Sequence, residues 1–146
     1  MKPATALLLL VWAGACASRV SGPPAIVVDR SVCSRCAMLI SERAYAAAVR
    51  WADGREQVFD DIGCLVAAVP ISKPDGAQYW FHDVTDGEWI SGVNPVFVAS
   101  AAMRTPMGGG VVAHRTRAAA EEAARRQGGR VVVDLAQLPA PERGAR

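Results

Sequence analysis

The chain has 146 residues, of which 51% are hydrophobic and 21% charged, and its formal net charge is +2. This length allows one domain with a real core, or two very small lobes that share one. The arginines are scattered rather than gathered into a basic stripe, which argues against a nucleic-acid-binding protein. No long apolar run follows the first residues, so we do not expect the mature chain to span a membrane.

The first residues have the pattern of an export signal. A lysine is followed by an apolar stretch that is too short to span a bilayer. Ala13-Gly14-Ala15 then place small residues before Cys16, which resembles the lipobox of bacterial lipoproteins, although lipoboxes usually carry Leu where this chain has Ala13. We therefore predict a signal peptide over 1–16 with lipidation of Cys16. Ordinary signal-peptidase cleavage nearby is the alternative.

Residues 17–31 are predicted to be a tether, because Gly and Pro residues near their middle break any helix. Residues 32–86 are then predicted to form a β-β-α-β unit. Asp53-Gly54 is a strong hairpin signal, and Asp60-Asp61 suits the start of a helix. The expected elements are strands over 46–51 and 56–59, a helix from residue 62 that stops before residue 70, and a strand over 78–84.

Residues 87–136 are predicted to repeat this order, and residues 137–146 to form a flexible tail. The expected elements are strands over 96–99 and 111–114, a helix over 116–127 closed by two glycines, and a strand over 130–135. Each unit is too small to bury a core alone. The sequence therefore predicts an α+β fold made of two β-β-α-β units packed together.

The sulfur-containing residues predict a copper site. Cys36 and Met38 are two residues apart, and a second thioether, Met107, lies in a glycine-rich turn. Thiolate and thioether together favour Cu(I) over harder cations. If residues 36 to 38 form a strand, both sulfurs share a face and can bind one atom. Cys33 is a candidate for an additional ligand, because an odd number of cysteines in an exported chain is not explained by disulfides alone.

Other residues have simpler interpretations. Cys64 lies on a predicted helix beside apolar residues, where a buried, inert thiol is the commoner role. His82 and His114 stand singly in predicted strands. Asp60 and Asp61 suit a helix cap. The less favoured alternative is that their carboxylates orient a metal ligand. A zinc ribbon would need a second Cys-x-x-Cys or paired histidines, and the sequence has neither.

Four ordered motifs resemble the NosL family of copper-binding lipoproteins, which are named for the maturation of nitrous-oxide reductase. They are Cys-Ala-Met-Leu-Ile at 36–40, Phe-Asp-Asp-Ile-Gly-Cys at 59–64, Gly-Glu-Trp-Ile at 87–90 and Thr-Pro-Met-Gly-Gly-Gly at 105–110. The resemblance covers about 32–135. It implies β-β-α-β units related to a domain of organomercurial lyase, and a single Cu(I) site with Cys36, Met38 and Met107 as ligands.

The chain departs from the commonest family form at two positions. Ala37 stands where Gly is usual, which should matter little, and His114 stands where an aromatic residue is usual. The second departure leaves open an extra ligand or a pH-sensitive neighbour of the site.

The ligand chemistry and the resemblance together predict a Cu(I) metallochaperone, which is a carrier and not an enzyme. We expect it to be lipid-anchored in the bacterial cell envelope, on the exported side of the membrane. It would accept copper from a transporter and pass it to an apo-cuproenzyme, with nitrous-oxide reductase as the leading recipient by resemblance.

Two enzymatic alternatives stay open. One is an exported thiol-disulfide oxidoreductase that uses Cys33 and Cys36, and the other is an enzyme of organomercurial-lyase type with paired thiols. Copper carriage needs Met38 and Met107 and tolerates the loss of Cys33, whereas redox chemistry needs both cysteines and ignores the methionines.

Overall fold

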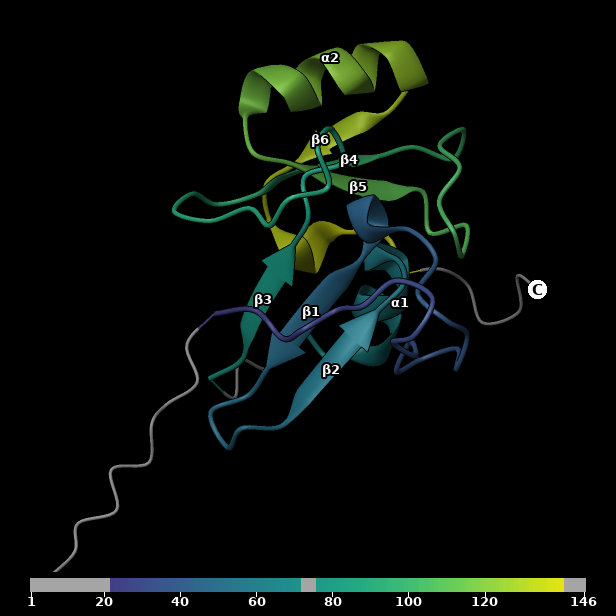
Figure 1. Cartoon of the computed structure of the whole chain (residues 1–146). Coiled ribbons are helices and arrows are strands. Elements are labelled where there is room, and N and C mark those ends of the chain that lie inside the picture. Colours follow the sequence, from purple (N-terminus) through teal and green to yellow (C-terminus); the bar gives the residue numbers. More distant parts are fainter. Residues whose placement is uncertain (1–21, 72–75, 141–146) are drawn as a thin grey trace, which may run out of the picture.

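The computed structural model of the chain describes residues 22–71 and 76–140. Cys16 and the predicted signal peptide lie outside the described residues. Within these ranges the fold is α+β, with two three-stranded antiparallel sheets and two α-helices (Figure 1). In the described ranges, no helix is long and apolar enough to cross a membrane. The predicted relation to organomercurial lyase stays a prediction.

The first sheet follows the predicted order of elements. Its central strand β1 (Ala47–Arg50) pairs antiparallel with β2 (Glu56–Phe59) and with β3 (Gln78–Phe81). The helix α1 (Ile62–Ala68) begins directly after β2, where the Asp61 side chain accepts a hydrogen bond from the Cys64 N–H at 3.2 Å. This is the capping role predicted for the acidic pair. β3 ends before residue 84, because the chain turns into a loop after Phe81.

The second sheet repeats this arrangement. β4 (Val96–Ala99) is central and pairs with β5 (Val111–His114) and β6 (Arg130–Val132), and α2 (Arg117–Gln127) covers one face of the sheet (Figure 1). β6 is shorter than predicted. A 3₁₀ helix, η2 (Leu135–Gln137), replaces the end of the expected strand, with the Asp134 side chain capping its first turn.

The two units share one core, as their small size requires. Phe81 of the first sheet and Phe97 of the second meet edge to face, with ring centroids 5.0 Å apart. β5 alternates between two environments: Val111 and Ala113 belong to the shared core, whereas Val112 belongs to a smaller cluster that includes buried residues of α2. The cysteines of the first unit belong to the same shared core as Val111 and Ala113. One face of β5 is therefore turned towards that core, and its opposite face is turned towards α2.

Residues 22–31 lie on the domain, although they were predicted to be a tether. Pro24 is buried, and Ile26 packs against the shared core. The Arg50 guanidinium donates to the Gly22 carbonyl at 2.6 Å, and the Asp29 N–H donates to the Ile40 carbonyl at 2.9 Å. In Figure 1 this purple segment crosses the molecule from the side where the described chain begins to the opposite side, near the start of α1.

Residues 31–40 and 81–90 form two loops with the same backbone course. In the first, the Cys33 N–H donates to the Met38 carbonyl at 2.8 Å; in the second, the Asp83 N–H donates to the Glu88 carbonyl at 2.8 Å. Isolated β-bridges close both loops, and the residue at the reversal has positive φ in both, 60° at Ala37 and 71° at Gly87. The predicted boundary between residues 86 and 87 falls inside the second loop, so the repeat begins earlier than expected.

The first loop corrects one geometric expectation. Cys36 and Met38 are not on a strand, because Ala37 between them takes the left-handed conformation at φ 60°. The argument that alternate strand residues share a face therefore does not apply to this pair.

Candidate metal centre

Three cysteines from two elements meet at one end of the first unit. Cys33 and Cys36 come from the first loop and Cys64 from α1, and their three sulfur atoms all lie within 4.8 Å of one another. Cys33 and Cys64 are buried, with 1% and 0% of their surface exposed, whereas Cys36 is partly exposed. All three are free thiols. The arrangement is a sulfur cluster with one member that solvent can reach.

The surroundings of Cys33 stabilise its thiolate form. The Cys64 thiol donates a hydrogen bond to the Cys33 sulfur, and this bond is the main reason why the pKa of Cys33 lies well below its usual range. Burial opposes the shift, and the backbone N–H groups of Cys36, Asp60 and Arg35 add to it. The pKa of Cys64 is raised, first by its bond to Cys33 and then by burial. Cys33 is therefore the thiol of the three whose surroundings most favour ionisation.

The pKa of Cys36 shifts in the opposite direction. Partial burial raises its pKa, and the charge on Cys33 adds to the effect. Asp60 is also affected by the cluster. Burial raises the pKa of its carboxyl group, and the nearby Cys33 charge raises it further, although the Ser41 N–H donates to it at 2.8 Å. Asp60 thus lies near the Cys33 sulfur, and as an acid it cannot neutralise a negative charge on the cluster.

Asp61 joins α1 to the glycine-rich loop 105–110. One carboxylate oxygen accepts from the Cys64 N–H. The other accepts from the Thr105 hydroxyl, from the Met107 N–H at 3.3 Å and from the Gly109 N–H at 3.1 Å. A Cβ on residue 109 would lie 2.5 Å from the carboxylate, so only glycine fits there. One buried carboxylate therefore fixes the backbone of both Cys64 and Met107.

The two methionines that were predicted as ligands differ in burial. Met38 is 57% exposed, and Met107 is partly buried against the shared core. The backbone of each is tied to a cysteine: the Met38 carbonyl accepts from Cys33, and the Met107 N–H shares the Asp61 carboxylate with Cys64. Met38 thus presents a thioether to solvent beside the partly exposed Cys36.

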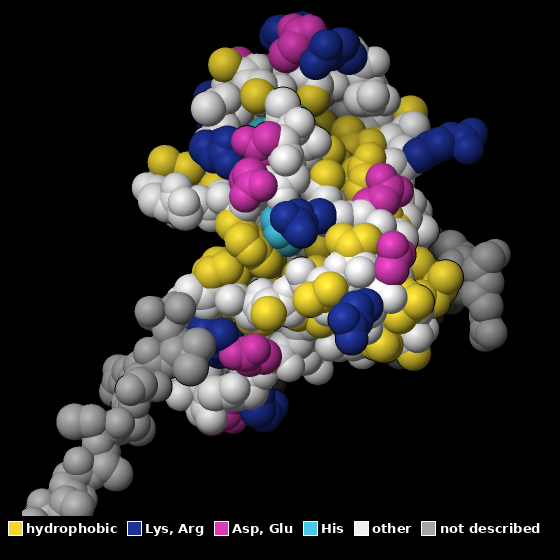
Figure 2. All heavy atoms as spheres, viewed as in Figure 1, with side chains coloured by type: hydrophobic (Ala, Val, Ile, Leu, Met, Phe, Trp, Pro, Cys, Tyr) yellow, Lys and Arg dark blue, Asp and Glu magenta, His cyan; other side chains and the backbone are white. Residues whose placement is uncertain are grey.

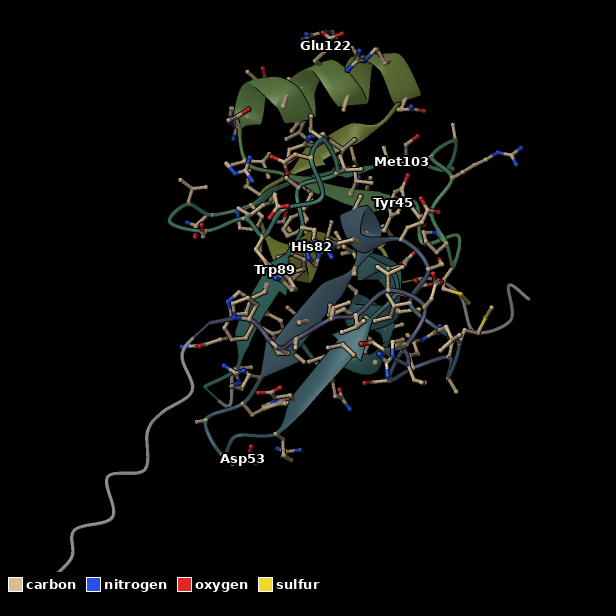
Figure 3. The ribbon with its side chains drawn as sticks, viewed as in Figure 1. Tyr45, Asp53, His82, Trp89, Met103 and Glu122 are labelled. Atoms are coloured by element: carbon tan, nitrogen blue, oxygen red, sulfur yellow. The ribbon has the colours of Figure 1, made fainter. Side chains whose placement is uncertain are left out.

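The structure does not bring the two histidines to the cluster. His82 stacks on Trp89 with ring centroids 3.6 Å apart, and its Nδ1 lies 2.9 Å from the Ala46 carbonyl oxygen (Figure 3). His114 is 96% buried on the α2 side of β5, beside a cavity of about 580 Å³ that Tyr45 and Met103 also line. Neither of its ring nitrogens has a hydrogen-bond partner within the described part of the chain. His114 is therefore not placed to bind a metal ion at the cysteine cluster.

The sequence model of the NosL family matches residues 24–141, which is most of the chain. The chain belongs to the NosL family. Among solved structures, it is similar to the copper chaperone NosL from Shewanella denitrificans. The two are 18% identical, with a TM-score of 0.63 over 77% of this chain and 93% of that one. This likeness supports the NosL fold. The comparison with curated proteins finds no match.

Cys64 is the site residue that the sequence did not identify in this NosL chain. Its neighbours on α1 are buried, as predicted, but its sulfur lies with those of the Cys-x-x-Cys loop. Two signals pointed towards it. The number of cysteines after Cys16 is odd, and Cys64 follows the acidic pair that opens the helix.

Proposed function

We propose that this NosL protein is a Cu(I) metallochaperone, a carrier rather than a catalyst. The observation that carries the proposal is the group of three cysteine sulfurs within 4.8 Å, with the partly exposed Cys36 on its outer side. Family membership and the name of the similar solved structure support the same conclusion. Sulfur ligands suit Cu(I), which is soft and prefers thiolate and thioether donors.

The cargo would be exchanged at the outer side of the cluster. We infer that Cys36 supplies the charged ligand there, with Met38 and Met107 as thioether donors. Met38 is well exposed, so an incoming sulfur from a partner can approach the metal on that side. Weak, neutral thioethers can be replaced one at a time while the thiolate keeps the metal, which suits a carrier.

The partners and location follow from the same proposal. Copper would come from an exporting or importing transporter and pass to an exported apo-cuproenzyme of the nitrous-oxide reductase type. A lipid on Cys16 would hold the protein at the membrane in the bacterial cell envelope. Figure 2 shows acidic and basic side chains interspersed on the viewed face, without the one-sign stripe that a nucleic acid would require.

Copper binding can be tested on the reduced mature protein by competition with a chromophoric Cu(I) chelator. We expect one Cu(I) per chain and weaker Zn(II) binding, because structural zinc sites use four tetrahedral ligands and the described cluster offers three thiols. Cys36→Ser should nearly abolish Cu(I) binding, and Met38→Ala should weaken it less, since a thioether neutralises no charge. Wild-type protein that fails to bind Cu(I), or binds Zn(II) more tightly, would reject the proposal.

Anchoring can be tested separately by membrane fractionation and mass spectrometry of the N-terminus. Wild-type protein should sediment with membranes and carry acyl chains on Cys16, because several chains give stable anchoring. Cys16→Ser should appear in the soluble fraction. An unmodified wild-type N-terminus located beyond residue 16 would contradict lipidation without affecting the copper proposal.

A further inference from the structure

The two repeated loops place different side chains on one scaffold. Their hydrogen-bond patterns align Cys33 with Asp83, Cys36 with Asp86 and Met38 with Glu88. The following elements align too: the Ser34 N–H donates to the Val58 carbonyl at 2.9 Å, and the Val84 N–H donates to the Ala113 carbonyl at 3.0 Å. The two loops can therefore be compared position by position.

In the second loop, the scaffold holds an anion and supplies its counter-charge. The Asp83 carboxylate accepts from the backbone N–H groups of Thr85 and Arg115, each at 2.8 Å. The Arg115 guanidinium lies 3.7 Å from Asp83 and 3.0 Å from Asp86. Two carboxylates at the positions of the two loop cysteines are thus paired with one cation that belongs to the protein.

In the first loop, the same scaffold places Cys33 where the second loop has the buried carboxylate of Asp83. The backbone N–H groups of Arg35 and Asp60, which correspond to those of Thr85 and Arg115, face the Cys33 sulfur. The residue that corresponds to Arg115 is Asp60, an acid. Cysteine sulfurs at these two positions are soft donors that suit Cu(I), whereas the carboxylates of the second loop pair with Arg115.

The first unit also has an additional sulfur. Asp61 and Thr116 cap their helices in the same way, through the N–H groups of Cys64 and Ala119 respectively. Cys64 therefore stands where the second unit has a methyl group. The thiol is fully buried, and its sulfur lies within 4.8 Å of both loop cysteines. The start of the helix does not itself require a thiol at this position, because the second helix begins with alanine there.

We propose that Cys33 and Cys64 join Cys36 in an inner, three-sulfur Cu(I) position, at the place where the second unit pairs two carboxylates with Arg115. This inference rests on the proposed copper-carrying function. Cys36 belongs to both the inner position and the outer exchange position with Met38 and Met107. Copper at rest lies on the three thiol groups, shielded from solvent, and moves outward through Cys36 when a partner sulfur approaches.

The decisive measurement uses the wild-type protein. Mature protein with its methionines replaced by selenomethionine is loaded with one Cu(I) per chain, and its copper X-ray absorption is recorded. The inner position predicts a shell of about three sulfur atoms and no selenium. A shell that contains selenium would place the resting metal on the thioethers and overturn the inference, while the copper-carrying function would stand.

Variants then isolate Cys64. Cys64→Ala copies the second unit, and Cys64→Ser keeps a hydroxyl that can still donate to Cys33 but is a poor Cu(I) ligand. Both should lower Cu(I) affinity by at least about tenfold, which is the scale for loss of even an indirect metal contact. Both should also remove one sulfur from the shell. Met103→Ala, which removes a thioether from the separate cavity beside His114, is the matched control and should bind copper as the wild type does.

The outcomes separate the two proposals. If Cys64→Ser binds copper with wild-type affinity and an unchanged shell, Cys64 serves only packing or hydrogen bonding, and the inner position is wrong. If the wild type binds no Cu(I), the proposed function itself fails. Circular dichroism of the metal-free variants checks the fold, and the selenomethionine experiment decides the matter if neither variant folds.

Discussion

Asp61→Ala should be among the most destabilising single substitutions in this protein. The side chain is fully buried and accepts four hydrogen bonds: from the Cys64 and Met107 N–H groups, the Thr105 hydroxyl and the Gly109 N–H. Alanine would leave these donors without an acceptor and would separate the loop 105–110 from α1. The perturbation therefore acts on the contact between the two units.

The magnitude follows from the number and kind of bonds. A hydrogen bond to a charged group contributes about 1.5–3 kcal/mol, and bonds that share one acceptor are not additive. Because part of the loop can be rehydrated, we expect Asp61→Ala to lower the free energy of unfolding by about 4 kcal/mol. Asn keeps one acceptor oxygen for the three loop donors but turns an N–H₂ group towards Cys64, so Asp61→Asn should cost about 2 kcal/mol.

Urea denaturation followed by circular dichroism would measure both values. Asp60→Asn is the matched control, because this neighbouring carboxylate accepts only from the Ser41 N–H at 2.8 Å and its hydroxyl at 3.4 Å. Neutralising Asp60 also removes its repulsion with Cys33, so the control should cost about 1 kcal/mol or less. Equal losses for Asp60→Asn and Asp61→Asn would refute the role assigned to the Asp61 carboxylate.

Three further substitutions test particular features. Ala37→Gly should raise the free energy of unfolding by about 1 kcal/mol, since residue 37 has φ 60°, and thermal melting that shows a loss would contradict this geometry. Gly109→Ala should be destabilising and should weaken Cu(I) binding, because the new Cβ would meet the Asp61 carboxylate at 2.5 Å; a variant with wild-type stability and affinity would disprove the close approach. His114→Phe should be stabilising, because it removes two buried nitrogens without partners. Burial lowers the pKa of His114 below its ordinary 6.5, so folding of the wild type opposes protonation. The difference in free energy of unfolding between the wild type and His114→Phe should therefore be constant above pH 6.5. Below pH 6.5 the wild type should lose stability relative to the variant, by at most about 1.4 kcal/mol per pH unit, until the pH passes the lowered pKa of His114. A stability difference that does not change between pH 7.5 and pH 5 would show that His114 is not buried in this way.

The element order could be predicted because its signals are local. The Asp53-Gly54 hairpin, the capping residue Asp61 and the glycine after α2 each act within a few residues of the chain. The strand ends were less accurate. β3 stops early because the chain enters a loop in which the Val84 N–H donates to the Ala113 carbonyl of the other unit, and β6 stops early because the chain turns into the 3₁₀ helix η2.

The site was only partly predictable because it depends on long-range packing. Cys36 and Met38 were identified from their chemistry, but the turn at Ala37 was not, since alanine rarely takes positive φ. Cys64 joins the cluster only when α1 packs against the first loop. The repeat of the loops was hidden because Cys-x-x-Cys-x-Met and Asp-x-x-Asp-x-Glu share a backbone course without sharing side-chain chemistry.

The attachment of residues 22–31 to the domain limits how far the protein can reach. With Pro24 buried and Gly22 bound by Arg50, only residues 17–21 separate the proposed anchor at Cys16 from the folded domain. Even a fully extended chain of this length spans only about 20 Å. A lipidated form would therefore stay within about one small-domain diameter of the bilayer surface, too close to deliver copper deep into the periplasm. A donor or recipient of the lipidated form would have to come to the membrane surface, where the side of the domain opposite Gly22 would be turned away from the bilayer.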